Sequence, residues 1–286
     1  MTRVADVVVG DTLRVRREYA PVPSGDADIL DDVLLRDSET GEFVGAHCRL
    51  VGDDAAVLAD RLRVWGRGYG AWFGKNPTKH SFRLSGINNQ HRTFGFAAPS
   101  PLRQNYGSRI SRFNLEEPDA ALLLDRLAVT CWEQFEDLLP AAARSHREIT
   151  DAIHPGWLMG GGLSGWTSGI VNRTAALPYH RDSGNLPASW SAMVVLRSRI
   201  DGGHLDIPEL GTVLRCDDLS LTLFNGQSYL HGVTPFTSRS NVGYRLSVVF
   251  YTKSAFANAA APGVDEIRRA QKRATENADS HRQEAP

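Results

Sequence analysis

Cysteine is scarce in this 286-residue chain, and its spacing argues against the sites that cysteine pairs build. Cys48 and Cys131 lie 83 positions apart, and Cys131 and Cys216 lie 85 apart. An odd number without a C-x-x-C pair disfavours a disulfide framework or a cysteine zinc site and is typical of a reducing compartment. No apolar run approaches the roughly 20 residues of a membrane span, and the first 20 residues lack a signal-peptide cleavage pattern. We therefore expect a cytoplasmic protein.

Several catalytic motifs are also missing. The stretch GRGYGAWFGKN resembles a phosphate-binding loop, but Tyr69 stands in place of its first glycine and Asn76 in place of its magnesium-binding Ser or Thr. The sequence contains neither an H-E-x-x-H zinc motif nor the G-x-S-x-G of α/β-hydrolases. Most histidines have no ligand-like neighbour in the sequence, and we expect structural roles for His47, His80, His91, His146, His154 and His281.

Charge is unevenly distributed, although the net charge is only −1. Residues 61–115 carry ten Lys or Arg and no Asp or Glu, and aromatic residues are interleaved with them. Basic and aromatic residues together suit a surface that contacts phosphates and stacks bases, so a nucleic acid is one partner that fits this segment. The alternative is a basic face that pairs with the acidic residues of 1–60, with the aromatic side chains in the core.

The hydrophobic pattern indicates an α+β, mainly β protein. The pattern predicts extended segments at residues 12–20 and 32–50, and the turn DSETGEF indicates that the second is a hairpin. It predicts loops and short strands at 66–114. From residue 157 onward, short runs rich in Val, Ile, Leu and Thr alternate with turn residues, as in an antiparallel sandwich or barrel. The apolar periodicity and the position of proline predict helices at 53–64, 119–139, 141–153 and 264–276.

We expect one domain, a jelly roll buttressed by helices. No internal repeat or long linker divides the chain. The expected parts are an N-terminal helical and loop part (1–156), a jelly-roll catalytic core (157–253), and a C-terminal helix with a frayed tail (254–286).

One group of residues suits metal chemistry. His180 and Asp182 form an H-x-D pair between two predicted strands, and His231 follows a later strand. Residues two apart in an extended segment point the same way, so His180 and Asp182 can reach one ion. Two imidazoles and one carboxylate on one face of iron(II) leave positions open for dioxygen and a cosubstrate. The residues thus predict an iron site.

A cosubstrate carboxylate requires a buried cation, and the strand YRLSVVFY supplies a candidate. Arg245 and Ser247 lie two apart and therefore share one face of that strand. A guanidinium fork beside a hydroxyl suits the far end of a dicarboxylate. Arg239 is the competing candidate, but it lies in the polar turn TSRSN, where we expect it to be solvated.

Together, the H-x-D pair, the distal His and the Arg with Ser two residues later resemble the iron(II)/2-oxoglutarate dioxygenases. The stretches from WTSGIVNR to DGGHLDIP, LFNGQSYLHGVTPF and YRLSVVFY resemble the TET/JBP branch, which oxidises the 5-methyl group of pyrimidines in nucleic acid. The resemblance covers residues 157–253 and, more faintly, 92–103. It implies a double-stranded β-helix fold and the use of iron(II), 2-oxoglutarate and O2.

The resemblance also implies site roles. His180, Asp182 and His231 would hold iron, Arg245 and Ser247 the distal carboxylate of 2-oxoglutarate, and Asn172 its inner carboxylate. Asn185, the last residue of H-R-D-x-x-N, would bind a flipped 5-methylcytosine or thymine. The chain lacks the cysteine-rich zinc segment of the larger animal enzymes, so segment 61–115 would have to engage DNA.

Two other functions agree with parts of the sequence. Hydroxylases of small metabolites or natural-product intermediates share the iron and 2-oxoglutarate residues, and the near-neutral net charge suits them. A non-catalytic β-sandwich that binds modified DNA or sugar would require the histidines and aspartate to be there by coincidence. Iron-dependent succinate release would exclude that reading.

Overall fold

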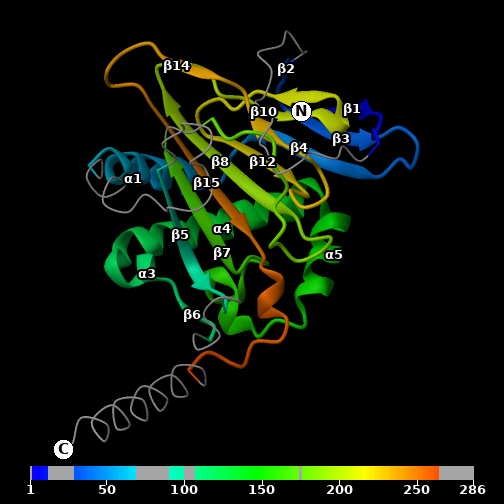
Figure 1. Cartoon of the computed structure of the whole chain (residues 1–286). Coiled ribbons are helices and arrows are strands. Elements are labelled where there is room, and N and C mark those ends of the chain that lie inside the picture. Colours follow the sequence, from blue (N-terminus) through cyan, green and yellow to red (C-terminus); the bar gives the residue numbers. More distant parts are fainter. Residues whose placement is uncertain (1, 12–28, 69–89, 100–106, 174–175, 264–286) are drawn as a thin grey trace, which may run out of the picture.

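A mixed sheet of nine strands runs through the molecule and joins the N-terminal part to the jelly-roll core in this computed structural model (Figure 1). The structure describes residues 2–11, 29–68, 90–99, 107–173 and 176–263. The segments expected at 12–20 and 264–276 lie outside the described residues. In spatial order the sheet contains β1 (Arg3–Val7), β3 (Val33–Asp37), β4 (Phe43–Arg49), β12 (Ser220–Phe224), β8 (Ser191–Ser198), β15 (Tyr244–Tyr251), β7 (Ser168–Arg173), β5 (Gln90–Ala97) and β6 (Arg109–Ile110).

A second, four-stranded sheet faces part of the first. An apolar cluster from both sheets fills the space between them, with Val195 and Phe224 from the large sheet and Leu205 and Leu214 from the small one. Two sheets with side chains interdigitating between them make the expected jelly-roll core. The small sheet contains β13 (Gly232–Val233), β10 (Leu205–Ile207), β11 (Thr212–Leu214) and β2 (Ile29–Leu30), and β14 (Phe236–Ser238) pairs with β9 (Ile200–Gly202) beside it.

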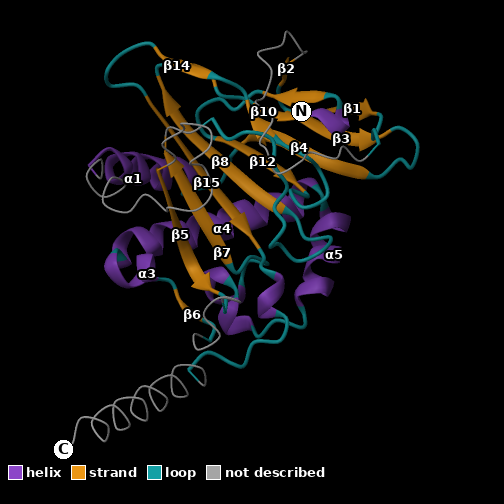
Figure 2. Cartoon of the chain, in the orientation of Figure 1, coloured by secondary structure: helices purple, strands orange, loops and turns teal. Residues whose placement is uncertain are grey.

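Helices cover the other face of the large sheet, as Figure 2 shows. Leu124, Leu127, Cys131 and Phe135 recur at helical spacing on the longest helix and are buried against the sheet. The expected buttress is therefore present. The helices are α1 (Ala55–Gly68), α3 (Arg112–Glu116), α4 (Pro118–Leu138) and α5 (Pro140–Thr150), and short 3-10 turns lie at Pro155–Trp157, Met159–Gly162, Pro208–Leu210 and Ser254–Phe256.

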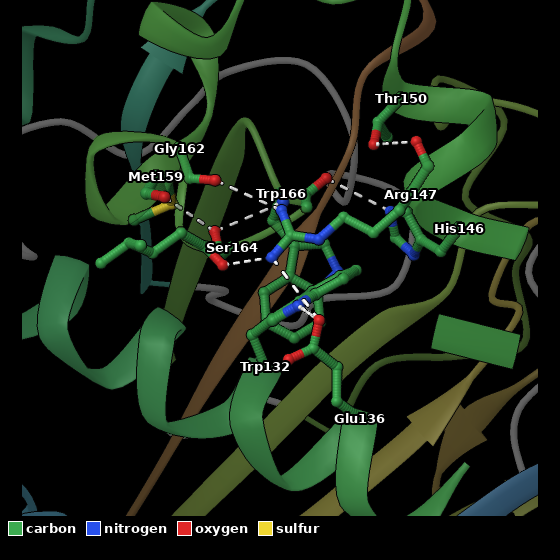
Figure 3. Close-up of polar contacts among 11 residues, drawn as sticks. Trp132, Glu136, His146, Arg147, Thr150, Met159, Gly162, Ser164 and Trp166 are labelled. Carbon is green, nitrogen blue, oxygen red and sulfur yellow. Dashed lines mark hydrogen bonds and ion pairs between the residues drawn. The ribbon is translucent and has the colours of Figure 1, made fainter. Parts of the chain in front are cut away.

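Polar contacts fasten α4 and α5 to the turns that precede β7 (Figure 3). The guanidinium of Arg147 lies 4.2 Å from the centre of the Trp132 ring and donates to the carbonyl oxygen of Gly162 at 3.3 Å. The preceding residue, His146, is fully buried, and its Nδ1 accepts a hydrogen bond from the backbone N–H of Trp190. These contacts hold the helical layer in register with the sheet.

Most of the expected elements are confirmed, and the differences lie in the N-terminal part. The expected hairpin is β3 and β4, which pair antiparallel, and the expected helices at 53–64, 119–139 and 141–153 are α1, α4 and α5. Residues 1–156 also contribute β1, β3, β4 and β5 to the same sheet as the core, so this part is not only helices and loops. The division at residue 156 stays a prediction.

No described helix is long and apolar enough to cross a membrane. The cytoplasmic location also stays a prediction.

Candidate metal and cosubstrate site

The H-x-D segment and the distal histidine lie side by side because their backbones pair. The N–H of His180 donates to the carbonyl oxygen of His231 at 2.9 Å, and the N–H of His231 donates back at 3.0 Å. The N–H of Asp182 donates to the carbonyl oxygen of Gly226 at 2.9 Å. Two loops whose paired residues lie 44 and 51 positions apart in sequence are thus joined like antiparallel strands, and this pairing brings the three side chains together.

Those side chains form a preformed cluster of metal-ligand atoms. One ligand atom from each of His180, Asp182 and His231 lies within 4.8 Å of the others, and His180 Nε2 is 3.8 Å from Asp182 Oδ1. Nδ1 of His180 contacts the carbonyl oxygen of Pro178 at 2.9 Å, and Nδ1 of His231 contacts that of Tyr229 at 3.0 Å. A carbonyl only accepts, so each Nδ1 carries the hydrogen and each Nε2 keeps a lone pair for a metal.

The electrostatics of the cluster suit a cation. Burial, followed by the neighbouring His180, lowers the pKa of His231 from 6.5 to about 4, so this ring is neutral at physiological pH. Asp182 is the one carboxylate of the cluster. Two neutral imidazoles and one carboxylate are the donor set that iron(II) oxygenases use, so the residues fit that ion. Within the described residues, no other group of three or more His, Cys, Asp or Glu has this spacing.

The cluster opens into a cavity of about 380 Å³ between the two sheets, within the range of small-molecule sites. Side chains alternate along β15, so Ser247, Val249 and Tyr251 face this cavity while Leu246 and Val248 face the helices. The lining residues are His91, Ile170, Asn172, Leu177, His180, Arg181, Asp182, Ser183, Gly184, Asn185, Met193, Leu205, Phe224, His231, Val233, Ser247, Val249, Tyr251 and Lys253.

Arg245 continues the cavity-facing row of β15 beyond Ser247 and is only 2% exposed. Its Nε donates to the carbonyl oxygen of Gly203 at 3.1 Å, whereas its Nη2 has no hydrogen-bond partner within the described residues. Burial lowers the pKa of Arg245, and no described carboxylate forms an ion pair with it. A buried guanidinium with an unused donor fits an anionic group such as a cosubstrate carboxylate.

Arg239, the competing candidate, lies elsewhere. It forms an exposed ion pair with Asp201 on the β9–β14 ribbon and does not line the cavity.

Asn172 and Ser247 lie opposite each other on β7 and β15. The Asn172 amide nitrogen is 3.5 Å from the Ser247 hydroxyl, and its Oδ1 has no hydrogen-bond partner within the described residues. Both residues line the cavity, so both are available to a polar ligand there.

Asn185 also lines the cavity, but its amide nitrogen is already engaged. Nδ2 donates to the Ser191 hydroxyl at 3.2 Å and to Oδ2 of Asp182 at 3.4 Å. The backbone N–H of Asn185 donates to the Asp182 carbonyl oxygen at 3.0 Å. Asn185 therefore orients Asp182 through two hydrogen bonds, and its Oδ1 is the amide atom that these contacts leave unused.

His91, Tyr251 and Lys253 are among the cavity residues that were not expected from the sequence. His91, expected to be structural, lies opposite Asn172 on β5 and lines the cavity. Tyr251 and Lys253 line it at the end of β15, and the Lys253 ammonium lies 5.6 Å from the Tyr251 ring centre. Tyr251 extends the alternation of Arg245 and Ser247, so the sequence held a signal for it. His91 reaches the site only through the long-range pairing of β5 with β7, which periodicity does not reveal.

Segment 61–115 is less available to DNA than its composition suggests. Arg63 pairs with Asp60 and Asp218, and Arg92 and Arg112 both pair with Glu116. The aromatic side chains of Trp65, Phe94, Phe96 and Phe113 pack into the apolar clusters. These arginines are therefore ion-paired and these aromatic side chains lie in the core, as the alternative expected, but only Asp60 among their partners belongs to residues 1–60. Lys75, Lys79, Arg83 and Arg103 lie outside the described residues.

Comparisons with known proteins agree with this geometry. Residues 163–254 match the family model Tet_JBP, the oxygenase domain of the 2OGFeDO superfamily. The fold is similar to that of NgTET1 in complex with 5mC DNA, at 12% identity and a TM-score of 0.58, over 82% of this chain and 85% of that one.

More distant likeness extends to a Pseudomonas putida prolyl-4-hydroxylase, at 14% identity and a TM-score of 0.40, over 73% of this chain and 92% of that one. A viral collagen prolyl hydroxylase from Paramecium Bursaria Chlorella virus-1 is similar at 13% identity and a TM-score of 0.38, over 72% of this chain and 94% of that one. No curated protein matches the sequence.

The superfamily uses iron(II), 2-oxoglutarate and O2, and the donor set and the buried arginine fit the first two. Residues 163–254 therefore match an oxygenase domain of the 2OGFeDO superfamily, and the chain is an iron(II)/2-oxoglutarate-dependent dioxygenase with a jelly-roll core.

Proposed function

We propose that this enzyme hydroxylates the 5-methyl group of a pyrimidine, 5-methylcytosine or thymine, in DNA. The observation that carries the proposal is one cavity bordered by the His180, Asp182 and His231 cluster, by Ser247 and by Asn185. Metal ligands, a cosubstrate wall and a residue suited to an extruded base therefore meet in one place. The fold similarity to a protein bound to 5mC DNA supports DNA as the substrate.

Each residue has a separate task in this proposal. His180, Asp182 and His231 hold iron(II) through two Nε2 atoms and a carboxylate oxygen. Arg245 and Ser247 bind the distal carboxylate of 2-oxoglutarate, and Asn172 contacts its inner carboxylate. When bound, the iron and its cosubstrate supply an oxidation in which 2-oxoglutarate and O2 become succinate and CO2 while one C–H bond becomes C–OH. The apolar walls, including Ile170 and Val249, keep water from the reacting methyl group.

The cavity also offers what a base removed from its stack needs. Extrusion costs a few kcal/mol, which the pocket must return through stacking and hydrogen bonds. Tyr251 supplies an aromatic ring, Asn185 Oδ1 an acceptor, and Lys253 a donor. Burial lowers the pKa of Lys253, and no described carboxylate pairs with it, so its ammonium is available to carbonyl oxygens of a substrate.

Hydroxylation of a free small molecule is the second candidate. The ion pairs that neutralise Arg63, Arg92 and Arg112 favour it, because they remove three cations from the expected phosphate-binding face. The two candidates differ in whether the substrate must be part of a DNA strand.

Incubation with iron(II) and 2-oxoglutarate tests the proposal directly. The substrates are duplex DNA with 5-methylcytosine, the same duplex unmethylated, and the free nucleosides, with His231→Ala as the inactive control. We expect hydroxymethylated nucleoside, measured by mass spectrometry after digestion, in one-to-one ratio with succinate from DNA alone. Product from free nucleosides but not from DNA would favour the second candidate, and no product with any pyrimidine would refute the proposal.

The role of Asn185 in base binding has its own test. We expect Asn185→Ala to keep slow succinate release without substrate while its oxidation of DNA falls at least tenfold. Ser189→Ala, a buried hydroxyl in the same loop that does not line the cavity, is the matched control. Near-wild-type yields of both products in Asn185→Ala would show that Asn185 does not bind the base.

A further inference from the structure

Arg181, the residue between the two ligands of the H-x-D pair, reaches across to the loop that carries His231. Its side chain is 24% exposed. Nη1 donates to the carbonyl oxygen of Ser228, and Nη2 forms an ion pair with Oε1 of Glu209. One guanidinium therefore contacts two segments besides its own.

Glu209 completes the connection from the far side. It lies in the 3-10 turn Pro208–Leu210 after β10 and is only 3% exposed. Its Oε1 accepts from Arg181, and its Oε2 accepts from the backbone N–H of Leu230 at 2.6 Å. Both carboxylate oxygens are used, so the buried charge is satisfied.

These bonds surround the backbone that orients His231. Ser228 and Leu230 are held on either side of Tyr229, whose carbonyl oxygen fixes the His231 ring through Nδ1 at 3.0 Å. The bridge begins at Arg181, whose chain neighbours are His180 and Asp182. A single ion pair thus connects both halves of the ligand cluster.

We propose that Arg181 and Glu209 are positioning residues that set the separation of His231 from His180 and Asp182, and thereby the affinity for the metal. This inference rests on the proposed iron site. Groups that orient metal ligands through hydrogen bonds typically contribute 10–100-fold to metal affinity. The backbone pairing of His180 with His231 remains without the bridge, so the loop still forms but orients the imidazole less tightly.

Titration of metal-free, full-length protein with cobalt(II), followed by its visible absorption, tests the inference without turnover. The variants are Arg181→Gln, Arg181→Lys, Glu209→Gln and the Arg181→Gln/Glu209→Gln double variant. Arg239→Gln breaks the exposed pair with Asp201 and serves as the matched control. Thermal unfolding in a chelator measures the stability of each metal-free variant separately.

We expect the dissociation constant for cobalt(II) to rise about 10–100-fold in Arg181→Gln and Glu209→Gln. The double variant should be hardly weaker than either single one, because both act through one bridge. Arg181→Lys keeps the charge but not both contacts, so it should recover part of the affinity. Arg239→Gln should bind as the wild type does.

The outcomes separate this inference from the proposed function. Failure of the wild type to bind cobalt(II) would overturn the iron site itself. Normal binding by a folded Arg181→Gln variant would overturn the positioning role and leave the iron site intact. If Glu209→Gln or Arg181→Gln does not fold, the double variant decides, because it removes both charges and leaves neither one buried without its partner.

Discussion

At the scale of single residues, Gly226 shows how closely the ligand cluster is packed. A Cβ atom there would lie 2.5 Å from Oδ2 of Asp182 and 3.4 Å from Cε1 of His231. The carboxylate is the movable end of its side chain, so it can turn away without unfolding the loop. We therefore expect Gly226→Ala to fold normally and to bind metal at least tenfold more weakly.

Metal titration checks this expectation, with Gly184→Ala as the control. Gly184 lines the same cavity, and a Cβ there would meet nothing within 4 Å. Equal metal affinity for Gly226→Ala and the wild type would mean that Asp182 does not need its observed position.

Arg245 predicts opposite effects on stability and on cosubstrate binding. Replacing it with Met keeps most of the volume but removes a buried charge that no described carboxylate pairs with. Replacing buried charged groups with apolar ones is often neutral or stabilising. We expect Arg245→Met to unfold at the wild-type temperature or above when no cosubstrate is present. Its KM for 2-oxoglutarate should rise tens to thousands of fold, since losing a buried charged partner costs roughly 2–5 kcal/mol.

Steady-state kinetics with Arg239→Met alongside checks the assignment. A raised KM in Arg239→Met together with an unchanged KM in Arg245→Met would reverse the two roles.

At the scale of secondary-structure elements, His146 makes the attachment of α5 sensitive to pH. Burial lowers its pKa from 6.5 to about 3. Nε2 contacts the Gly165 carbonyl oxygen and the Thr252 hydroxyl at 3.2 Å, and Nδ1 accepts from Trp190 N–H, so the neutral ring is the one that fits. Between pH 6.5 and 3 the unfolded chain binds a proton here that the folded chain does not. The free energy of unfolding therefore decreases as the pH is lowered from 6.5 to 3, by up to about 1.4 kcal/mol per pH unit.

Denaturant unfolding at pH 7.5 and pH 5 measures this contribution. His146→Gln should be less stable than the wild type at pH 7.5 but should lose less stability on acidification. Other buried histidines act equally in both proteins and cancel in the difference. Parallel losses in the two proteins would show that His146 does not carry the pH dependence.

Elements were predictable where local periodicity decides them. The spacing of Leu124, Leu127 and Phe135 indicated α4, and the turn DSETGEF indicated the β3–β4 hairpin. β1 and β5 were not recognised as members of the main sheet, because their partners β3 and β7 lie tens of residues away. The proximity of His180 and Asp182 was predictable because residues two apart in an extended segment share a face, whereas His231 and His91 reach the cavity through tertiary pairing.

At the scale of the whole molecule, the segment that matches the family model is shorter than the part of the chain that we expect to fold as one unit. Residues 163–254 include β7, β8, β12 and β15, but β4 pairs with β12 on one side and β5 pairs with β7 on the other. Excision of this segment would expose both edges of the remaining large sheet, the edge of β11 that pairs with β2, and the apolar face that α4 covers. We expect the 163–254 fragment to be insoluble or unfolded.

Circular dichroism and size-exclusion chromatography of the fragment beside the full chain test this expectation. A monomeric fragment with cooperative unfolding would show that the N-terminal strands and helices are dispensable for folding.

The two faces of β15 have a consequence for variation in this enzyme. Tyr244, Leu246, Val248 and Phe250 pack in the cluster beneath the helices, while Arg245, Ser247, Val249 and Tyr251 lie on the opposite face of the strand. Substitutions at even-numbered and at odd-numbered positions of this strand should therefore have different effects. In a saturation library over 244–251, even positions should change abundance, and odd positions should change turnover or substrate choice in protein that still accumulates. New specificity would therefore evolve along the odd positions of a strand whose even positions stay fixed by the core.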